Sequence, residues 1–427
     1  MRLLAKEETP LDWTSKKIGS YVLGHKGGAA LRPSDFSDVG FPVIPKKAIQ
    51  PTGELLIESP TYCTNEFASN NKRSIVDNSY TITTLRDLVP TGPTIGTVVN
   101  FTSEEKYILS QGVYGLKLND DLDKKYLSYL SNTSFYRKVM QRIMVGSTQV
   151  HIRTPEYLDL EIQIPPLPEQ QKIAKILSTW DRAISTTERL IDNSTQQKKA
   201  LMQQLLKGKK RLLDESGKSF EGEWERLKLE DIVIKTQLGT SERTKDVEET
   251  STIPLIKMGN LTWGGFSFDK LETLPKSKVD ESLILKNGDF LFNTRNTPEL
   301  VGKSAVWKEQ QVEATFDNNI NRITFNRNIN TDFMCLYLTY GKGKSLISSL
   351  SAGSTSVAAI YWKDLKNIKL KIPTLSEQQK IATVLTNADK EIELLEQQLT
   401  DLQQEKKALM QVLLTGKKRV VVDGELK

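Results

Sequence analysis

The sequence predicts an α+β protein of two globular domains, each followed by a long α-helix. Its 427 residues exceed what one hydrophobic core usually serves, so two or more domains are expected. Residues 164–211 match residues 372–419 without a gap at 26 of 48 positions, and each copy follows a globular segment of similar length. This long period excludes a stacked solenoid and indicates a duplicated unit of one domain and one helix.

Each repeated block has the spacing of a long amphipathic helix. Apolar side chains recur at alternating intervals of four and three residues, which is the pattern of a coiled-coil seam. Trp180 and Ala388 occupy matching positions of the two copies, which suggests that a large side chain packs against a small one. Lys198 and Lys406 interrupt the apolar seam near its end. Three interpretations are open: the helices splay apart there, a partner helix enters there, or the lysine side chains extend to solvent. The side chains expected to pack the helix pair are Ile173, Leu177, Trp180, Ile184, Ile191, Leu201, Leu205, Ile381, Leu385, Ala388, Ile392, Leu395, Leu399, Leu402, Leu409 and Leu413.

The ends of both helices carry recognisable signals. Ser376 is a candidate N-cap with Gln379 three residues later, and Gly208 and Gly416 stand where a left-handed residue ends a helix. A helix over 169–207 would be roughly 58 Å long at about 1.5 Å per residue, which suits a spacer. The "GKKR" that ends each block is interpreted as a solvated basic helix end in preference to a phosphate contact.

The globular segments combine strand and helix signals. Short β-rich pieces such as "DFLFNT" (289–294) and "INRITF" (320–325) alternate with helical pieces such as "LDKKYLSYLSN" (122–132). The expected organisation is a first domain, a first helix block, a second domain, a second helix block and a tail, at 1–163, 164–211, 212–371, 372–419 and 420–427.

Composition and charge exclude several classes of protein. With 38% hydrophobic and 26% charged residues and no apolar run of 18 residues, the chain has no expected membrane segment, and its N-terminus lacks the features of a signal peptide. Its two cysteines form neither a disulfide framework nor a metal cluster, so a reducing cytoplasm is the expected compartment. A net charge of +6 permits nucleic-acid binding without requiring it.

The repeated motif and its context resemble a known family. The helix blocks begin "IPPLPEQQKIAKIL" and "IPTLSEQQKIATVL", and each domain closes with "GST" followed by an Asp-Leu pair. The second domain adds "IPLIKMGNL" (253–261) and "LKNGDFLFNTRN" (285–296), whereas the first has "SIVDNSYTITT" without a Gly-Asp turn. Over essentially the whole chain, these features resemble the specificity subunit of type I restriction-modification systems.

The resemblance implies a non-catalytic, cytoplasmic DNA reader. Each domain would recognise one half of a bipartite, asymmetric target in the major groove, and the two helices would pack antiparallel, with pseudo-twofold symmetry, to hold the domains at a fixed separation. The implied partners are double-stranded DNA, two methyltransferase subunits that bring S-adenosylmethionine, and restriction subunits that use ATP and Mg. The chain itself would bind no cofactor or metal.

Base and phosphate contacts require Arg, Lys, Asn, Gln, Ser or Thr side chains on loops. The candidates in the second domain are Arg243, Lys245, Lys257, Asn260, Thr294, Arg295, Asn296, Ser354, Thr355 and Ser356. The candidates in the first domain are Arg32, Ser34, Lys46, Lys47, Lys72, Arg73, Ser147, Thr148 and Gln149.

Two other functions are compatible with a duplicated helical chain: a coiled-coil scaffold without DNA contact, and a fused DNA methyltransferase or nuclease. Against the enzyme, the sequence has no G-x-G-x-x-G after a strand, no Asn-Pro-Pro-aromatic motif and no paired cysteines. "GKGKS" (341–345) ends like a P-loop but lacks the first glycine, so we interpret it as a basic surface turn.

Overall fold

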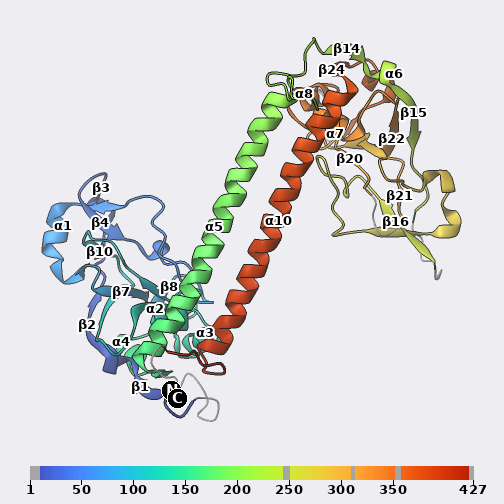
Figure 1. Ribbon diagram of the computed structural model, residues 1–427. Coiled ribbons are helices and arrows are strands. Elements are labelled where there is room, and N and C mark those ends of the chain that lie inside the picture. Colours follow the sequence, from blue (N-terminus) through green and yellow to red (C-terminus); the bar gives the residue numbers. More distant parts are fainter. Residues whose placement is uncertain (1–9, 244–250, 309–312, 352–356, 423–427) are drawn as a thin grey trace. The chain divides into compact units, whose positions relative to one another are not determined.

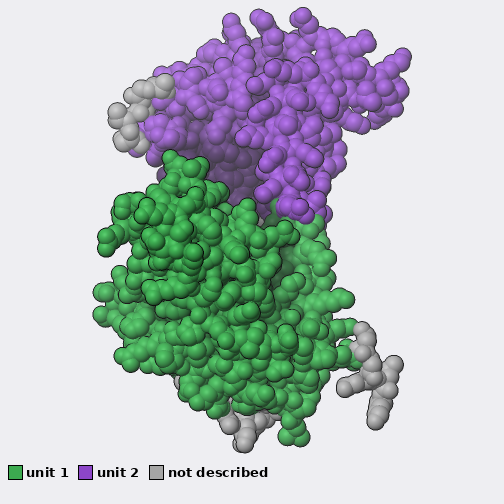
Figure 2. Space-filling view, turned by 90° about the vertical axis from the view of Figure 1, so that its left-hand side faces the viewer, with its two compact units in different colours: residues 1–188, 397–427 green, residues 189–396 purple. Residues whose placement is uncertain are grey.

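The computed structural model describes residues 10–243, 251–308, 313–351 and 357–422, and it divides into two compact units. Unit 1 contains Met1–Glu188 and Gln397–Lys427, and unit 2 contains Arg189–Glu396 (Figure 2). The division crosses both long helices. Each unit therefore holds one globular domain, the half of one helix that follows this domain, and the opposite half of the other helix.

Unit 1 is built on four small sheets (Figure 1). The four-stranded antiparallel sheet has the order β2 (Val22–Gly27), β11 (Val113–Leu118), β7 (Tyr80–Thr84), β9 (Val98–Asn100). The five-stranded sheet has the order β3 (Phe36–Ser37), β5 (Tyr62–Cys63), β4 (Phe41–Ile44), β10 (Tyr107–Leu109), β6 (Ile75–Val76). The two-stranded sheets pair β1 (Thr14–Lys17) with β13 (Glu161–Ile164) and β8 (Arg86–Asp87) with β12 (Val150–His151). The short helices are α1 (Asn65–Asn70), α2 (Lys124–Ser131), α3 (Ser134–Ile143) and α4 (Thr154–Leu158).

Unit 2 also has four sheets. The four-stranded sheet has the order β15 (Val233–Leu238), β22 (Ile320–Phe325), β18 (Phe290–Asn293), β20 (Ser304–Val306). The three-stranded sheet has the order β17 (Glu272–Pro275), β16 (Thr252–Ile256), β21 (Thr315–Phe316). The two-stranded sheets pair β14 (Glu225–Lys228) with β24 (Lys369–Ile372) and β19 (Arg295–Asn296) with β23 (Ala358–Ala359). The short helices are α6 (Leu229–Ile232), α7 (Thr331–Thr339), α8 (Gly341–Ser349) and α9 (Trp362–Leu365).

The two domains share a common topology although their sequences diverge, and the second sheet of unit 1 has two additional strands, β3 and β6. Each has a four-stranded antiparallel sheet, a parallel strand pair in its second sheet, a helix pair and two separate two-stranded sheets. The strands β1 and β13 thus correspond to β14 and β24, and β8 and β12 correspond to β19 and β23. The predicted α+β class and two-domain architecture are confirmed. "GKGKS" differs from the expected turn because it forms the first residues of α8.

The long helices α5 (Leu167–Leu205) and α10 (Leu375–Leu413) have 39 residues each. Gly208 and Gly416 have φ of +64° and +74°, so the predicted left-handed helix ends are confirmed. After α5, the Gly208 N–H donates to Leu205 O (3.1 Å) and the Lys209 N–H donates to Gln204 O (2.9 Å), as in a Schellman motif. The expected N-cap at Ser376 is wrong, because α10 begins one residue earlier.

The first glutamine of the repeated Glu-Gln-Gln motif attaches each helix to its own domain. Gln170 accepts a hydrogen bond from the Asp123 N–H (2.9 Å) and donates to Asp121 O (2.9 Å), next to the N-cap of α2. Its counterpart Gln378 accepts a hydrogen bond from the N–H of Asn330 (2.9 Å), which is the N-cap of α7. Both glutamines are buried, so each replaces water at an otherwise unsatisfied backbone group.

A buried carboxylate at the start of each long helix binds an arginine that follows the end of the other helix. In unit 1, Arg419 binds Glu169 through two hydrogen bonds of 2.7 Å and also binds Asp12. In unit 2, Arg211 binds Glu377 at 2.6 and 2.7 Å. We call these two pairs the Arg–Glu clasps. The final arginine of each "GKKR" is therefore part of a clasp, and interpreting it as a solvated helix end is wrong.

The lysines that interrupt the heptad seam also have partners on the facing helix. Lys406 of α10 pairs with Asp181 of α5 in unit 1, and Lys198 of α5 pairs with Asp389 of α10 in unit 2. Both lysine side chains are 22% exposed, so their stems are covered by the helix pair. Within each unit, the first half of one helix lies beside the last half of the other, which is an antiparallel arrangement (Figure 1).

Each unit has one main core that includes both helices. In unit 1, Ile173 and Leu177 of α5 and Leu413 of α10 belong to the cluster formed with Tyr126 and Tyr136 of the domain. In unit 2, the corresponding helix residues pack with Phe290, Phe292 and Phe333. The expected packing residues that are buried are Ile173, Leu177, Leu205, Ile381, Leu385 and Leu413. Those that are half-buried are Trp180, Ile184, Ile191, Leu201, Ala388, Ile392, Leu395, Leu399, Leu402 and Leu409.

A polar network in unit 1 stabilises the loop between β8 and β9. Asp87 is 3% exposed, accepts hydrogen bonds from the Thr94 N–H (2.9 Å) and hydroxyl (2.7 Å), and forms an ion pair with Lys46 (3.0 Å). Burial alone would raise the pKa of Asp87, but the hydrogen bonds from Thr94 and Lys46 outweigh it and hold the pKa below the ordinary value of 3.8.

We expect Arg211→Ala to lower the free energy of unfolding by about 3 kcal/mol, because the substitution leaves the buried Glu377 carboxylate without a counterion. Urea denaturation monitored by circular dichroism measures this change. The neighbouring exposed Lys210→Ala serves as the control and should change stability by less than about 0.5 kcal/mol. The double variant Arg211→Met, Glu377→Gln should recover part of the loss. Equal stability of Arg211→Ala and Lys210→Ala would show that the clasp does not stabilise the fold.

The lowered pKa of Asp87 predicts an acid-sensitive contribution to stability. A carboxyl whose folded pKa is depressed stabilises the fold above its unfolded pKa, and this stabilisation is lost as the pH falls through the folded pKa. Urea midpoints measured between pH 7 and pH 2 should therefore fall more steeply below pH 4 for the wild type than for Asp87→Asn. Parallel curves for the two proteins would contradict the assignment.

Candidate nucleic-acid interface

A cavity in unit 2 brings three of the candidate DNA-binding residues together. Arg243, Thr294 and Arg295 line it, although about 50 residues separate the first from the other two. Its volume is about 780 Å³, and its remaining lining residues are Thr236, Leu238, Asn318, Asn319, Asn321, Ala359, Ile360, Tyr361 and Trp362. Strand β15, the β18–β19 turn, the segment before β22 and the segment between β23 and α9 therefore meet at this site.

Arg295 is an exposed cation of the cavity. It lies on β19, opposite Ala359 of β23, and its exposed guanidinium has no acidic partner among the residues that the structure describes. The backbone beneath it is fixed, because the fully buried Asn293 donates a hydrogen bond to Arg295 O (3.2 Å). A guanidinium held by its backbone but free at its tip can bind a guanine edge or a phosphate.

Other groups in the cavity are donors, acceptors and apolar surface. Arg243 donates to Asn318 Oδ1 (3.0 Å), and the Thr294 hydroxyl donates to Asn319 O (2.9 Å). Asn321 is 6% exposed, and its buried Oδ1 accepts no hydrogen bond from the residues that the structure describes. A buried acceptor without a partner costs free energy until a ligand or water satisfies it. Tyr361 adds an exposed ring that can contact a base or a sugar.

Unit 1 presents the same strand pair with a counterpart of Arg295. Arg86 lies on β8 opposite His151 of β12, and both side chains are exposed. Here the fully buried Thr84 donates its hydroxyl to Arg86 O (2.8 Å), as Asn293 donates to Arg295 O. We call the two strand pairs and their arginines the arginine platforms. Ser147, Thr148 and Gln149 form an exposed turn directly before β12, so three candidates lie beside the platform of unit 1.

Sequence reasoning missed Arg86, Asn318, Asn321 and Tyr361. Arg86 could have been found from the sequence. The segment "TTLRD" (83–87) spans the end of β7, just as "NTRN" (293–296) spans the end of β18. The other three belong to segments without a motif. Their proximity to Arg295 results from tertiary structure alone.

The other described candidates in unit 2, Lys257, Asn260 and Asn296, do not line the cavity. Lys257 forms an ion pair with Glu272 (2.7 Å), and the buried Asn260 donates to Ser267 O and Lys270 O (3.1 Å each), so Asn260 fixes the turn after β16. Asn296 stabilises the turn after Arg295 through its bond to Asn293 Oδ1 (3.2 Å). Lys245, Ser354, Thr355 and Ser356 lie outside the described residues.

The remaining candidates in unit 1 are spread over its surface. Arg32 and Ser34 are exposed around a short 3₁₀ turn, and Lys72 and Arg73 are exposed after α1. Lys47 is exposed next to Lys46, whose ammonium binds Asp87.

The described residues contain no group of three or more His, Cys, Asp or Glu side chains that could hold a metal. Burial raises the pKa of the Cys335 thiol to about 12, so this thiol is protonated at neutral pH. Among the described helices, none combines the length and the apolar character that a membrane span requires.

Comparison with known proteins identifies the chain's relatives. The family model for the type I restriction modification DNA specificity domain matches twice, at residues 10–193 and 221–404. The type I restriction enzyme MjaVIII specificity subunit of Methanocaldococcus jannaschii is 29% identical over 327 residues, covering 74% of this chain and 75% of the relative. The EcoKI specificity subunit of Escherichia coli is 22% identical over 263 residues, covering 60% of this chain and 56% of the relative.

Solved structures show the same fold. The type I restriction-modification S subunit from M. genitalium aligns with a TM-score of 0.56 at 15% identity, covering 95% of this chain and 98% of that one. The HsdS subunit from Thermoanaerobacter tengcongensis aligns with a TM-score of 0.51 at 17% identity, covering 96% and 98%. The two family matches cover most of the sequence, one in each half. The chain therefore belongs to the type I restriction-modification DNA specificity family.

Proposed function

We propose that this chain selects the DNA target of a type I restriction-modification complex, with each domain reading one half of a bipartite, asymmetric sequence. The arginine platforms carry the proposal. Both domains present an exposed arginine on the same strand pair, in both cases above a buried side chain that holds the arginine's carbonyl oxygen. Two domains that recognise different half-sites need the same backbone geometry to hold the arginine, and different side chains around it to distinguish the bases.

The DNA contacts that we propose centre on these platforms. In unit 2 they comprise Arg243, Thr294, Arg295, Asn321 and Tyr361, which line one cavity. In unit 1 they comprise Arg86 and the turn Ser147, Thr148 and Gln149. The exposed candidates Arg32, Ser34, Lys47, Lys72 and Arg73 are proposed as phosphate contacts, because lysine and arginine on loops position a protein on DNA without reading its sequence.

We assign DNA methylation and DNA cleavage to partner subunits of the complex. Two methyltransferase subunits would bring S-adenosylmethionine, and restriction subunits would bring ATP and Mg, while this chain supplies recognition and spacing in the cytoplasm. The helix pair formed by α5 and α10 is the proposed spacer. The two helix blocks are identical at 26 of 48 positions, and this repetition supports the docking of two equal partners.

Mapping modified bases in host DNA tests the function directly. A methylated bipartite motif should be present in cells that carry the gene and absent after its deletion. An unchanged pattern of methylation would refute the proposal.

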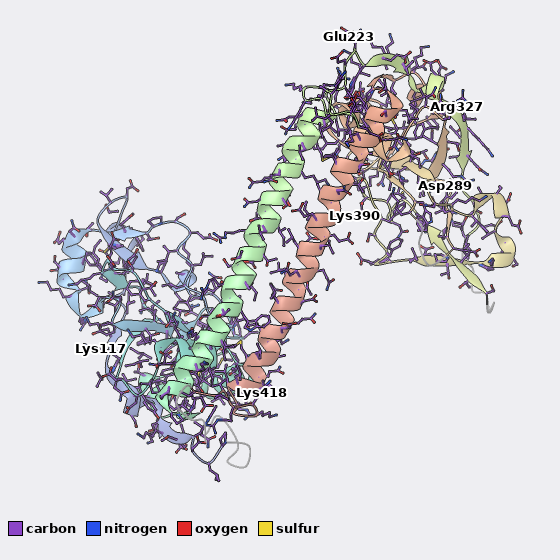
Figure 3. The ribbon with its side chains drawn as sticks, viewed as in Figure 1. Lys117, Glu223, Asp289, Arg327, Lys390 and Lys418 are labelled. Atoms are coloured by element: carbon purple, nitrogen blue, oxygen red, sulfur yellow. The ribbon has the colours of Figure 1, made fainter. Side chains whose placement is uncertain are left out.

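We expect Arg295→Ala to weaken specific DNA binding by about 1–3 kcal/mol and to relax sequence preference in one half-site. Arg86→Ala should have the same effect in the other half-site. The measurement is equilibrium binding of the assembled complex to duplexes altered in one half-site at a time. The exposed Arg327 (Figure 3) and Arg142 provide matched controls, because neither lies on a platform. If Arg295→Ala and Arg327→Ala bind every duplex alike, Arg295 is not a reading residue.

A further inference from the structure

The two-stranded sheet β14–β24 of unit 2 presents an unusual concentration of positive charge. Its register places Arg226 directly opposite Lys371, and Lys228 directly opposite Lys369. These four side chains are exposed and alternate with Leu227 and Leu370, which face the core. We call the four cations the basic ribbon. Like charges directly opposite each other on neighbouring strands destabilise a sheet. Lys228 already pairs with Glu230 (3.0 Å), so an added anion would stabilise the ribbon through Arg226, Lys369 and Lys371.

A cavity next to the ribbon extends the positive surface. It has a volume of about 530 Å³, and Lys207, Lys342, Lys369 and Lys371 contribute to its lining. Within the described part of the chain, none of these four ammonium groups has an acidic partner. The acidic residue of the lining is Glu223, which lies two residues before β14 (Figure 3 labels it). The cavity also contains Trp224, whose buried Nε1–H donates to no group of the described residues.

The corresponding sheet of unit 1 lacks this charge. There the register places Ser15 opposite Gln163, and Lys17 opposite Glu161. Lys17 also pairs with Asp159. The topological equivalents of Arg226, Lys228, Lys369 and Lys371 are thus Ser15, Lys17, Glu161 and Gln163. The same four positions therefore carry four cations in unit 2 and a net charge of zero in unit 1. The sheet does not need the cations in order to form.

The helix end does not account for the ribbon. A helix C-terminus attracts lysines, and this explains Lys207, which follows α5. Lys369 and Lys371 lie on a strand, and Arg226 lies on its partner strand. The ribbon is linked to the candidate interface through the chain itself, because Tyr361 of the interface cavity is followed by α9 and then by β24, with Lys363 and Lys366 between them.

We propose that the basic ribbon and its cavity bind phosphates of duplex DNA adjacent to the half-site read by unit 2. This inference rests on the proposed function and adds an asymmetry to it: unit 2 contacts the backbone outside its recognition residues, and unit 1 does not do so at the equivalent sheet. The phosphates of a DNA backbone suit this surface because they are closely spaced negative charges. The lysines and the arginine that would bind them lie on two paired strands and in the cavity beside these strands.

The test uses the substitutions Arg226→Ser, Lys369→Gln and Lys371→Gln combined in the full chain within the assembled complex. Arg226→Ser and Lys371→Gln introduce the residues found at the same positions in unit 1. Lys369→Gln removes a positive charge without adding a negative one. The sheet should therefore fold in the triple variant. The control combines Lys117→Gln, Lys125→Gln and Lys138→Gln, which remove equal charge from exposed positions of unit 1 (Figure 3 labels Lys117).

The measured quantity is the slope of log binding constant against log salt concentration, on a duplex that contains the methylated bipartite motif. Removing one lysine or arginine from a DNA phosphate lowers the magnitude of this slope by about 0.9, so we expect a decrease of about 2–3 for the ribbon variant and of less than about 1 for the control. Trimming the DNA that flanks the half-site of unit 2 should produce the same decrease in the wild type.

Equal slopes for the ribbon variant and the wild type would overturn the proposal. If the slope is unchanged while association with a partner subunit is abolished, the ribbon binds an acidic protein surface instead. Failure of the wild-type complex to bind the bipartite duplex would refute the proposed function itself, so the two failures can be told apart.

Discussion

The architecture depends on neutralising one buried carboxylate at the start of each long helix. Glu169 and Glu377 are 3% and 1% exposed, and a carboxylate removed from water needs a counterion with good hydrogen-bond geometry. The counterion comes from an arginine that follows the end of the other helix. A clasp can therefore form only where the start of one helix lies beside the end of the other. The antiparallel arrangement within each unit follows from this requirement.

The Lys–Asp pairs between the long helices fix the register in which the two antiparallel helices pack. Coiled-coil seams of leucine and isoleucine tolerate slippage by a heptad, whereas a polar residue in the seam must meet a partner at one position. Lys198 with Asp389 and Lys406 with Asp181 supply that constraint in both units. Because these residues, the clasps and the buried glutamines recur at the same 208-residue spacing, the identity between the two helix blocks is explained by structure and requires no catalytic role.

The sequence predicts features that depend on neighbouring residues, and it does not predict contacts between residues that are far apart in the chain. Heptad spacing and the glycines at 208 and 416 are local signals, and they predict both helices and their ends correctly. The strands around Phe290 and Ile320 are predicted for the same reason. The partners of Arg211 and Arg419 are 166 and 250 residues away, so helix-end rules predicted a solvated lysine-rich tail instead. Arg86 was missed because its domain lacks the Gly-Asp turn that marks the equivalent strand, and an Asx turn at Asp77 takes the place of that turn.

The proposed role of the arginine platforms explains how one fold could read two different sequences. The backbone of each arginine is fixed by a buried hydrogen bond, from Thr84 in one domain and from Asn293 in the other, so the side chain projects from a rigid strand. The residues beside it differ: His151 and Asp87 in unit 1, Ala359 and Asn296 in unit 2. Since a guanidinium can bind guanine or phosphate, its neighbours decide which contact it makes. Specificity can then change by substitution around the platform, while the core, the clasps and the helix register stay constant.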